Sequence, residues 1–422
     1  MITRPRFYYG WYVVGAAAGI NFANASVAIA ILSIFVIPMG DELGWSRTEI
    51  AGAASLGAIL GATLAPMSGW LVDRIGSRLI LVVGGIIIAT ACIYLSAVQT
   101  LLGFYTAFTL ARAAELGPIG VGTSTAIGKW FLRYRGRATG LIFFAESAGI
   151  MALAPIVQMV ISIGGWRMAW IVLGVWMFAI GVVPAALFIR RQSEDIGLSV
   201  DGGTQKKAPR SSLVVSAKDR EIEEISLTLG QALLTPSFWL LLVTLLIVSI
   251  GTSGVGVHLV PHLTQQGLSA QSAVGAISVM FTAGALASLA LGVASERVSP
   301  RLLMAVAYLL IAVSLAILIA ADTIVETYLF AVTNGVATTA FFIMPLLLCS
   351  SYYGRTSLGL IYGVSKAVQM AGLALGPLVA GLAYDTTGSY QIAFIWFSLL
   401  AGVSSLVILM ARRPTIPEVE PA

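Results

Sequence analysis

The chain has 422 residues, of which 58% are hydrophobic and 10% are charged, and its mean hydropathy is +0.94. A soluble protein carries about a quarter charged residues, so this composition excludes a soluble domain. Continuous apolar stretches, each close to the roughly 20 residues that span a bilayer, indicate transmembrane helices and exclude a β-barrel. The net charge of +5 does not indicate nucleic-acid binding, because the basic residues lie in short loops at the ends of these stretches.

Twelve apolar stretches follow one another along the chain. The first six are residues 10–38, 48–72, 79–97, 101–131, 138–163 and 168–189, and the second six are residues 237–263, 270–294, 302–321, 324–351, 358–383 and 392–411. A polar stretch separates the two sets. The sequence therefore predicts an all-α membrane protein with twelve transmembrane helices, six within residues 1–189, a linker at residues 190–236 and six within residues 237–422.

The Lys and Arg residues between the stretches are distributed unequally. One side holds the linker together with Arg4, Arg6, Arg74, Arg78, Arg133, Arg135, Arg137, Arg297, Arg301, Arg355, Arg412 and Arg413. The other side holds Arg47 and Arg167 beside several Asp and Glu residues. Loops rich in Lys and Arg stay in the cytoplasm, so both termini and the linker are expected there.

A ten-residue string occurs twice, each time just after the second stretch of a half. Residues 69–78 read GWLVDRIGSR, and residues 292–301 read GVASERVSPR. The glycine, the acidic residue and two arginines keep the same spacing in both copies. Internal duplication in so apolar a chain predicts a transporter built from two related helix bundles.

The six-plus-six arrangement, the central linker and the string at residues 69–78 resemble the major facilitator superfamily. The resemblance implies two pseudo-symmetric six-helix bundles around a central cavity, with alternating access by rocking of one bundle against the other. It also implies that the loop acid pairs with a helix end and with basic residues as a latch, which can break and re-form when bundles move. By position, the two latches comprise Asp73, Arg74 and Arg78, and Glu296, Arg297 and Arg301. Simple anchoring of the topology is the alternative role.

Three further strings narrow the resemblance. These are RFYYGW at residues 6–11, WF at 130–131 followed by RGRATG at 135–140, and HLVPH at 258–262. They are similar to the bacterial branch that contains oxalate/formate exchangers and monocarboxylate transporter homologues. The resemblance implies an organic anion as substrate, a location in the bacterial cytoplasmic membrane and an anion-binding lysine in the eleventh span.

Lys366 falls where the resemblance implies that lysine. It lies 11 residues after Arg355, roughly 16 Å inward along a helix, among the donors Tyr362, Ser365 and Gln369. A charge in lipid costs about 2.5–3.5 kcal/mol or more, so the side chain is expected to face a cavity or an ion pair. A carboxylate socket is one interpretation, and an ion pair with Glu146 that holds the bundles together is the other. The eighth stretch carries no charge, unlike that branch, which favours a monoanion over a dicarboxylate.

Three more ionisable residues lie deep in the apolar stretches. Arg112 and Glu115 are one helical turn apart in the fourth stretch and can pair directly, so Arg112 is either a second substrate-binding cation or is neutralised by Glu115. Glu146, in the fifth stretch, lies near the repeat-equivalent position of Lys366. A carboxyl group in a low-dielectric site can bind and release a proton near neutral pH. Glu146 is therefore the first candidate for proton coupling and Glu115 the second, whereas permanent pairing with Arg112 or Lys366 is the alternative.

Two asparagines, a tyrosine and a histidine complete the expected site. Asn24, Asn334 and Tyr362 can line the cavity, although polar residues between helices are as often packing contacts. His258, late in the seventh stretch, is a candidate gate or an interfacial histidine. No cofactor, metal site or enzyme motif is expected, and nothing in the sequence demands more than a monomer.

Together these features predict a secondary transporter for a small organic anion, of which a monocarboxylate with proton symport is the first interpretation. Its partners would be the organic anion, protons and the lipid bilayer. An anion exchanger of the oxalate/formate type remains open, because it would use the same lysine. A proton-coupled exporter of drugs or metabolites also remains open, because Arg112, Glu115 and Glu146 would serve proton antiport equally well.

Overall fold

The computed structural model describes residues 8–202, 226–268 and 270–414, and these residues form helices and loops without a β-strand. The N-terminal half contains α1 (Gly10–Asn24), α2 (Ile29–Leu43), α3 (Arg47–Ile75), α4 (Ser77–Leu95), α5 (Leu101–Ala114), α6 (Gly120–Trp130), α7 (Arg135–Trp176) and α8 (Val183–Phe188). The C-terminal half contains α9 (Leu229–Leu233), α10 (Pro236–Gln265), α11 (Ala270–Ala294), α12 (Pro300–Ile319), α13 (Ile324–Tyr353), α14 (Leu358–Thr387) and α15 (Gln391–Met410). Arg4, Arg6, Phe7 and most of the linker lie outside the described residues.

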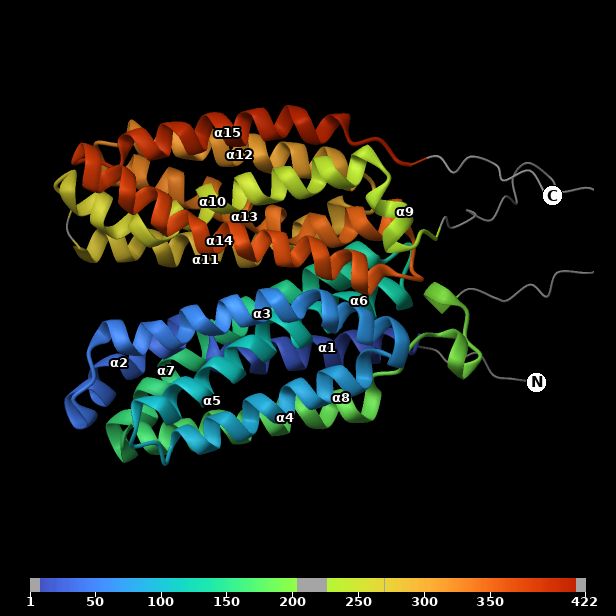
Figure 1. The fold of residues 1–422 in the computed structure, drawn as a ribbon, viewed down its shortest axis with the longest axis horizontal. Helices are drawn as coiled ribbons and strands as arrows, with labels where there is room; N and C mark the ends of the chain where they lie inside the picture. Colours follow the sequence, from blue (N-terminus) through green and yellow to red (C-terminus); the bar gives the residue numbers. More distant parts are fainter. Residues whose placement is uncertain (1–7, 203–225, 269, 415–422) are drawn as a thin grey trace, which may run out of the picture.

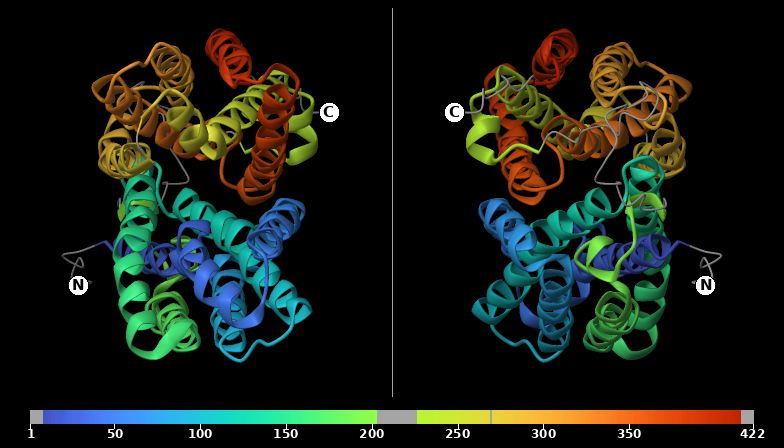
Figure 2. Two further views of the ribbon diagram at one scale, coloured as in Figure 1. Left: turned by 90° about the vertical axis from the view of Figure 1, so that its left-hand side faces the viewer. Right: turned by 90° about the vertical axis from the view of Figure 1, so that its right-hand side faces the viewer.

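The two halves form two separate bundles that lie side by side (Figures 1 and 2). Each bundle has its own apolar core, one built from α1 to α8 and the other almost entirely from α9 to α15. Many large apolar side chains on the outer faces are exposed, as expected for helices whose surroundings are lipid. The expected all-α architecture of two bundles is confirmed.

Among the residues that the structure describes, ten helical segments are long and apolar enough to span a membrane, and two features account for the difference from the twelve expected spans. The segment from Arg135 to Phe188 has 54 residues, about 81 Å if straight, but it reverses at Gly165, where φ is 75°. It therefore supplies two spans. The fourth span consists of α5, a π-helical turn at Glu115–Ile119 and α6, and it is less apolar than the others because it contains Arg112 and Glu115 together with several glycine, serine and threonine residues.

The first span is broken rather than continuous. α1 ends at Asn24, a 3₁₀ turn covers Ala25–Val27, and Ala28 is extended with ψ 148° before α2 begins. The span was expected to end at residue 38, but α2 continues to Leu43. Interrupted helices at mid-membrane are tolerated where they line a cavity, and this break places Asn24 in such a wall.

The start of α1 and the end of α15 lie at the same end of the molecule as α9 (Figure 1). This end also carries Arg74, Arg78, Arg297 and Arg355, and we call it the basic end. The opposite end carries Glu42, which pairs with Arg167, and also Asp322 and Asp385. Figure 1 shows the bundles meeting near the basic end and separating toward the opposite end.

Candidate functional site

A cavity of about 1160 Å³ lies between the two bundles. From the N-terminal bundle it is lined by α1, α2, α3, α7 and the broken fourth span, and from the C-terminal bundle by α10, α11, α13 and α14. The lining extends from Lys366 to Val36 and Leu378, nearer the opposite end. The cavity therefore lies where the resemblance implied a central one.

Four lining residues carry acidic or basic side chains, and all four were expected from the sequence: Arg112, Glu115, Glu146 and Lys366. Three come from the N-terminal bundle and Lys366 from the C-terminal bundle. Two are cations and two are carboxylates, so their formal charges cancel when all are ionised. The cavity thus holds a balanced set of charges in otherwise mostly apolar surroundings.

Lys366 is held by neutral groups. Its ammonium nitrogen donates a hydrogen bond of 3.2 Å to Gln369 Oε1 and lies 5.5 Å from the centroid of the Phe342 ring. Among the ion pairs formed by the described residues, none includes Lys366. The alternative role, a salt bridge to Glu146 that ties the bundles together, is therefore not present in this conformation.

Arg112 and Glu115 form an ion pair with little exposure, as their spacing predicted. Glu115 begins the π-helical turn that divides the fourth span, and such turns inside helices are frequent at functional sites. Arg112 packs against the backbone of α3 at Gly57, where an added Cβ would overlap the arginine side chain. The guanidinium is thus already paired with a carboxylate, and the Cβ and Cγ atoms of Arg112 are packed against α3.

Glu146 lies half-buried on α7, facing the same cavity. It is close enough to Lys366 and Arg112 for electrostatic interaction. No hydrogen bond or ion pair to Glu146 occurs in the part of the chain that the structure describes. Its carboxyl group is therefore open to the cavity.

Tyr362 forms part of the cavity floor, where it packs with Ala65, Val121 and Leu346 from both bundles. Asn24 also lines the cavity, and its side-chain oxygen is buried without a hydrogen-bond partner. Both positions agree with the expected cavity lining.

Asn334 does not line the cavity, contrary to expectation. It is buried between α13 and α12, where its amide donates a hydrogen bond of 2.9 Å to Ser314 Oγ. His258 lies beside the cavity rather than in its lining. Its Nε2 is 3.1 Å from the Pro377 carbonyl oxygen, and its ring stacks on Tyr390.

The basic end is closed by contacts between the bundles, of which Asp73 makes the most extensive. Its carboxylate accepts hydrogen bonds from the backbone N–H groups of Gly359 and Leu360, at 3.1 and 2.9 Å, and pairs with Lys129 at 2.8 Å. Those N–H groups belong to the first turn of α14, where the helix dipole favours an anion. An added Cβ on Gly69 would overlap the backbone of Gly359, so the helices approach very closely here.

The arginines of the first string do not join this contact. Arg74 stacks on the Trp70 ring at 5.3 Å, and both Arg74 and Arg78 are exposed. The basic partner of Asp73 is instead Lys129, at the end of α6. The expected partner set was wrong because the two arginines follow Asp73 onto the outer surface, whereas Lys129 lies under it.

Glu296 makes the matching contact in the second half. It pairs with the Arg137 side chain at 2.9 Å and accepts a hydrogen bond from the Arg137 backbone N–H at 3.3 Å, near the start of α7. Arg297 is exposed, and Arg301 donates to the Ala411 carbonyl oxygen at 3.4 Å within its own bundle. The partner of Glu296 is therefore Arg137 rather than the expected arginines.

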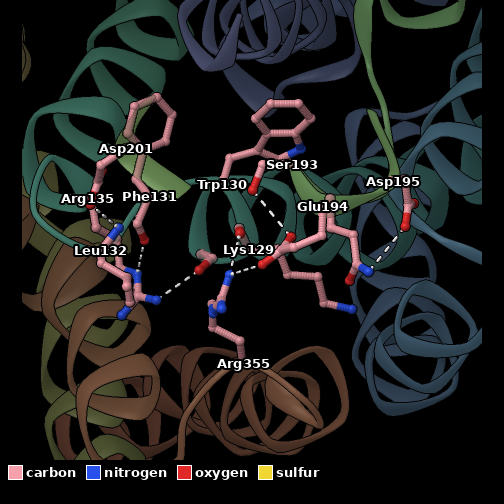
Figure 3. A network of polar contacts seen from close by, with 12 residues as sticks. Lys129, Trp130, Phe131, Leu132, Arg135, Ser193, Glu194, Asp195, Asp201 and Arg355 are labelled. Carbon is pink, nitrogen blue, oxygen red and sulfur yellow. Dashed lines mark hydrogen bonds and ion pairs between the residues drawn. The ribbon is translucent and has the colours of Figure 1, made fainter. Parts of the chain in front are cut away.

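The start of the linker extends this closure (Figure 3). Arg355, before α14, donates to the Lys129 carbonyl oxygen and pairs with Glu194 of the linker, both at 3.1 Å. Asp201 fixes the linker to the N-terminal bundle by accepting from the backbone N–H groups of Leu132 and Arg133. The polar network thus joins Asp73, Lys129, Arg355 and Glu194.

Sequence reasoning missed Lys129 and Glu194. Lys129 lies at the basic end of the fourth span, one residue before Trp130. A lysine at this position, next to the basic loop, could have indicated a partner for Asp73. Glu194 lies in the linker, for which the sequence predicted no contact with either bundle. Its pairing depends on how the linker folds back under α6, which no local pattern reveals.

Comparison with known proteins decides the family. Residues 14–322 and 274–422 match the Major Facilitator Superfamily. The chain belongs to this superfamily. Among solved structures, the human organic anion transporter MFSD10 superposes with a TM-score of 0.71 at 14% identity, covering 96% of this chain and all of that one. The fucose:proton symporter FucP of E. coli gives 0.69 at 13% identity, covering 96% of this chain and 98% of that one, and FucP in the outward conformation gives the same TM-score and identity.

Curated relatives are similar over most of the chain. Monocarboxylate transporter 12 of Rattus norvegicus is 23% identical over 419 residues, covering 96% of this chain and 85% of the relative. The oxalate:formate antiporter of Oxalobacter formigenes is 26% identical over 238 residues, covering 56% and 52%. The expected resemblance is confirmed, and this superfamily member is a multi-pass membrane transporter rather than an enzyme.

Proposed function

We propose that this transporter carries an organic monocarboxylate whose carboxylate binds Lys366. The observation that carries the proposal is the state of that ammonium group, which faces the cavity and is held only by the Gln369 carbonyl oxygen and the Phe342 ring among the contacts described above. A cation inside a membrane protein is costly unless an anion approaches it. A carboxylate supplies that anion, and the relatives named for monocarboxylates and for oxalate and formate support the same class.

One carboxylate fits the cavity better than two. On α11 the cavity is lined by Met280, Phe281 and Gly284, none of them charged. Arg112, the second cation, is already paired with Glu115. A dicarboxylate would therefore bring one carboxylate into the cavity without a free cation, and an unpaired buried charge is strongly unfavourable.

Glu146 is the proposed proton carrier. When it binds a proton, Arg112 and Lys366 face a single carboxylate, Glu115, and the cavity gains one positive charge. A monoanion restores neutrality, so the occupied cavity can close without burying net charge. This charge balance favours symport of one proton with one monocarboxylate.

The orientation follows from the basic loops. Lys- and Arg-rich loops stay in the cytoplasm, which puts the basic end inside and the opposite end outside. The similarity to the antiporter of Oxalobacter formigenes favours the cytoplasmic membrane of a bacterium. The described conformation is accordingly outward-facing, with Asp73 and Glu296 closing the inner side. Release of these two contacts after the proton and anion bind would open the cavity to the cytoplasm.

A binding experiment tests the role of Lys366. Butyrate binding to the purified protein is measured by calorimetry for the wild type, Lys366→Gln and Lys366→Arg. Loss of a charge-assisted hydrogen bond costs about 1.5–3 kcal/mol, so Lys366→Gln should weaken binding by roughly 10- to 100-fold. Lys366→Arg keeps the charge and should retain part of the affinity. Equal affinity of all three proteins would contradict the proposed site.

Exchange of two anions is the second candidate function, since one relative is an antiporter for oxalate and formate. An exchanger would use the same lysine but would need a substrate on both sides of the membrane. Uptake into vesicles with an empty lumen, compared with vesicles preloaded with unlabelled butyrate, distinguishes the two. Uptake only into preloaded vesicles would favour exchange over symport.

A further inference from the structure

The cavity separates charge from apolar surface along its length. Lys366 lies in the half of α14 nearer the basic end, and beyond it α14 continues toward the opposite end with apolar lining residues only. These residues are Met370, Leu373, Ala374, Pro377 and Leu378, at 4, 7, 8, 11 and 12 positions beyond the lysine. That spacing follows one face of the helix over about 18 Å.

The facing wall of the outer cavity is also apolar. α2 presents Ile29, Leu32 and Val36 at helical spacing, and the neighbouring face of α3 presents mainly alanines and Ile59. The outer cavity is therefore lined by apolar residues from both bundles.

The hydroxyl groups of this outer section are already used. Ser33 donates to the Ala30 carbonyl oxygen at 2.7 Å, and Ser55 donates to Ala51 at 3.4 Å. Ser253 on α10 donates to the carbonyl oxygen of Leu373. Each hydroxyl proton satisfies a helix carbonyl, so the outer cavity offers a ligand apolar contact and little polar recognition.

From this arrangement, and resting on the proposed role of Lys366, we infer that the preferred substrates are amphipathic monocarboxylates with an extended apolar body. The carboxylate lies at Lys366, and the body extends along the α14 stripe between α14 and α2. Small acids such as acetate reach the lysine but leave the stripe uncovered. Affinity therefore rises with the apolar length of the acid, because each buried methylene adds a favourable transfer term.

The test is a chain-length series measured by calorimetry on the purified protein. Acetate, butyrate, hexanoate and octanoate are compared with octanamide and with suberate, which has a carboxylate at each end. Affinity should rise about fourfold for each added methylene up to octanoate. Octanamide and suberate should bind at least tenfold more weakly than octanoate, the first for lack of charge and the second because its far carboxylate enters the apolar section.

Matched variants of one helix provide the control. Leu373→Ser with Leu378→Ser alters the stripe, whereas Leu375→Ser with Leu382→Ser alters exposed residues of α14 that do not line the cavity. The first pair should flatten the dependence on chain length and leave acetate affinity unchanged, and the second pair should leave the whole series unchanged. If wild-type affinity does not change with chain length but binding is lost in Lys366→Gln, this inference alone is overturned. A series that is unaffected by Lys366→Gln overturns the proposed function itself.

Discussion

Lys366 contacts a carbonyl oxygen and an aromatic ring, whereas Arg112 contacts a carboxylate, and this difference assigns them different roles. The first cation is available to a ligand, and the second is neutralised within its own helix. Glu146 faces the cavity without a direct partner among the described residues, and it interacts with both cations only at longer range. The same reasoning separates the two carboxylates that the sequence left as rival proton carriers.

Glu146→Gln fixes the side chain in a neutral form and should uncouple transport from protons. The cavity then keeps its extra positive charge at every pH, so butyrate binds with wild-type or higher affinity. Wild-type uptake should increase as the pH on the uptake side falls, whereas uptake by the variant should not change with pH. Proton-dependent uptake that survives in both Glu146→Gln and Glu115→Gln would contradict the coupling role.

Glu115→Gln should act mainly on stability. The substitution leaves Arg112 with little exposure and no carboxylate partner, and breaking such a buried pair costs about 3–5 kcal/mol. The midpoint of thermal unfolding should fall clearly in Glu115→Gln and recover in the double variant Arg112→Gln with Glu115→Gln. If the double variant keeps proton-dependent uptake, Glu115 is structural. Loss of proton dependence in the double variant at wild-type stability would make Glu115 a carrier.

At the level of helices, the ends of α14 and α7 explain how the basic end stays closed. Asp73 binds the first turn of α14 from the N-terminal bundle, and Glu296 binds the start of α7 from the C-terminal bundle. The duplicated string thus produces two equivalent contacts, each joining an acid of one bundle to a helix N-terminus of the other. Both contacts must break before the cavity can open at this end.

The Asp73 contact should stabilise the closed basic end more than the Glu194–Arg355 pair does. Asp73→Ala leaves Lys129 and two backbone N–H groups without their acceptor, and each unsatisfied group costs about 1–3 kcal/mol. The Glu194–Arg355 pair is partly exposed, with side chains 38% and 25% accessible, and such pairs contribute about 0–1 kcal/mol. The population open at the basic end should therefore rise more than tenfold in Asp73→Ala and less than about fivefold in Glu194→Gln.

Spin labels at positions 78 and 297, in variants that lack Cys92 and Cys349, report this opening. Arg78 and Arg297 are exposed at the basic end on different bundles, and the two native cysteines are buried. A longer label-to-label distance should gain population in Asp73→Ala. The same distance distribution in Asp73→Ala and the wild type would show that this contact does not hold the bundles together.

For the whole molecule, two apolar cores joined by a few polar contacts at one end fit alternating access by rigid bundles. The sequence was sufficient to predict the two bundles, because the length of an apolar stretch is a local property that marks each membrane-spanning segment. It was also sufficient to bring Arg112, Glu115, Glu146 and Lys366 together, since mid-membrane charges have few places other than a shared cavity.

Other features depended on tertiary packing and could not be read locally. The break at Ala25–Val27 has no proline or charge to mark it, so one continuous first span was expected. Asn334 turned toward Ser314 because α12 offered a hydroxyl, and a single polar residue on a helix does not reveal which neighbour it faces. Lys129 pairs with Asp73 because α3 and α6 pack against each other. The two residues are 56 positions apart in the sequence, and no motif spacing predicts this contact.

The most direct test of the central claim is uptake of labelled butyrate into proteoliposomes with an inward proton gradient. Weak acids cross lipid on their own, so vesicles without protein and vesicles with Lys366→Gln give the background. The account predicts gradient-driven accumulation above both backgrounds in the wild type and no excess in Lys366→Gln. Wild-type uptake equal to that of protein-free vesicles, or excess uptake that persists in Lys366→Gln, would contradict proton-coupled monocarboxylate transport through this site.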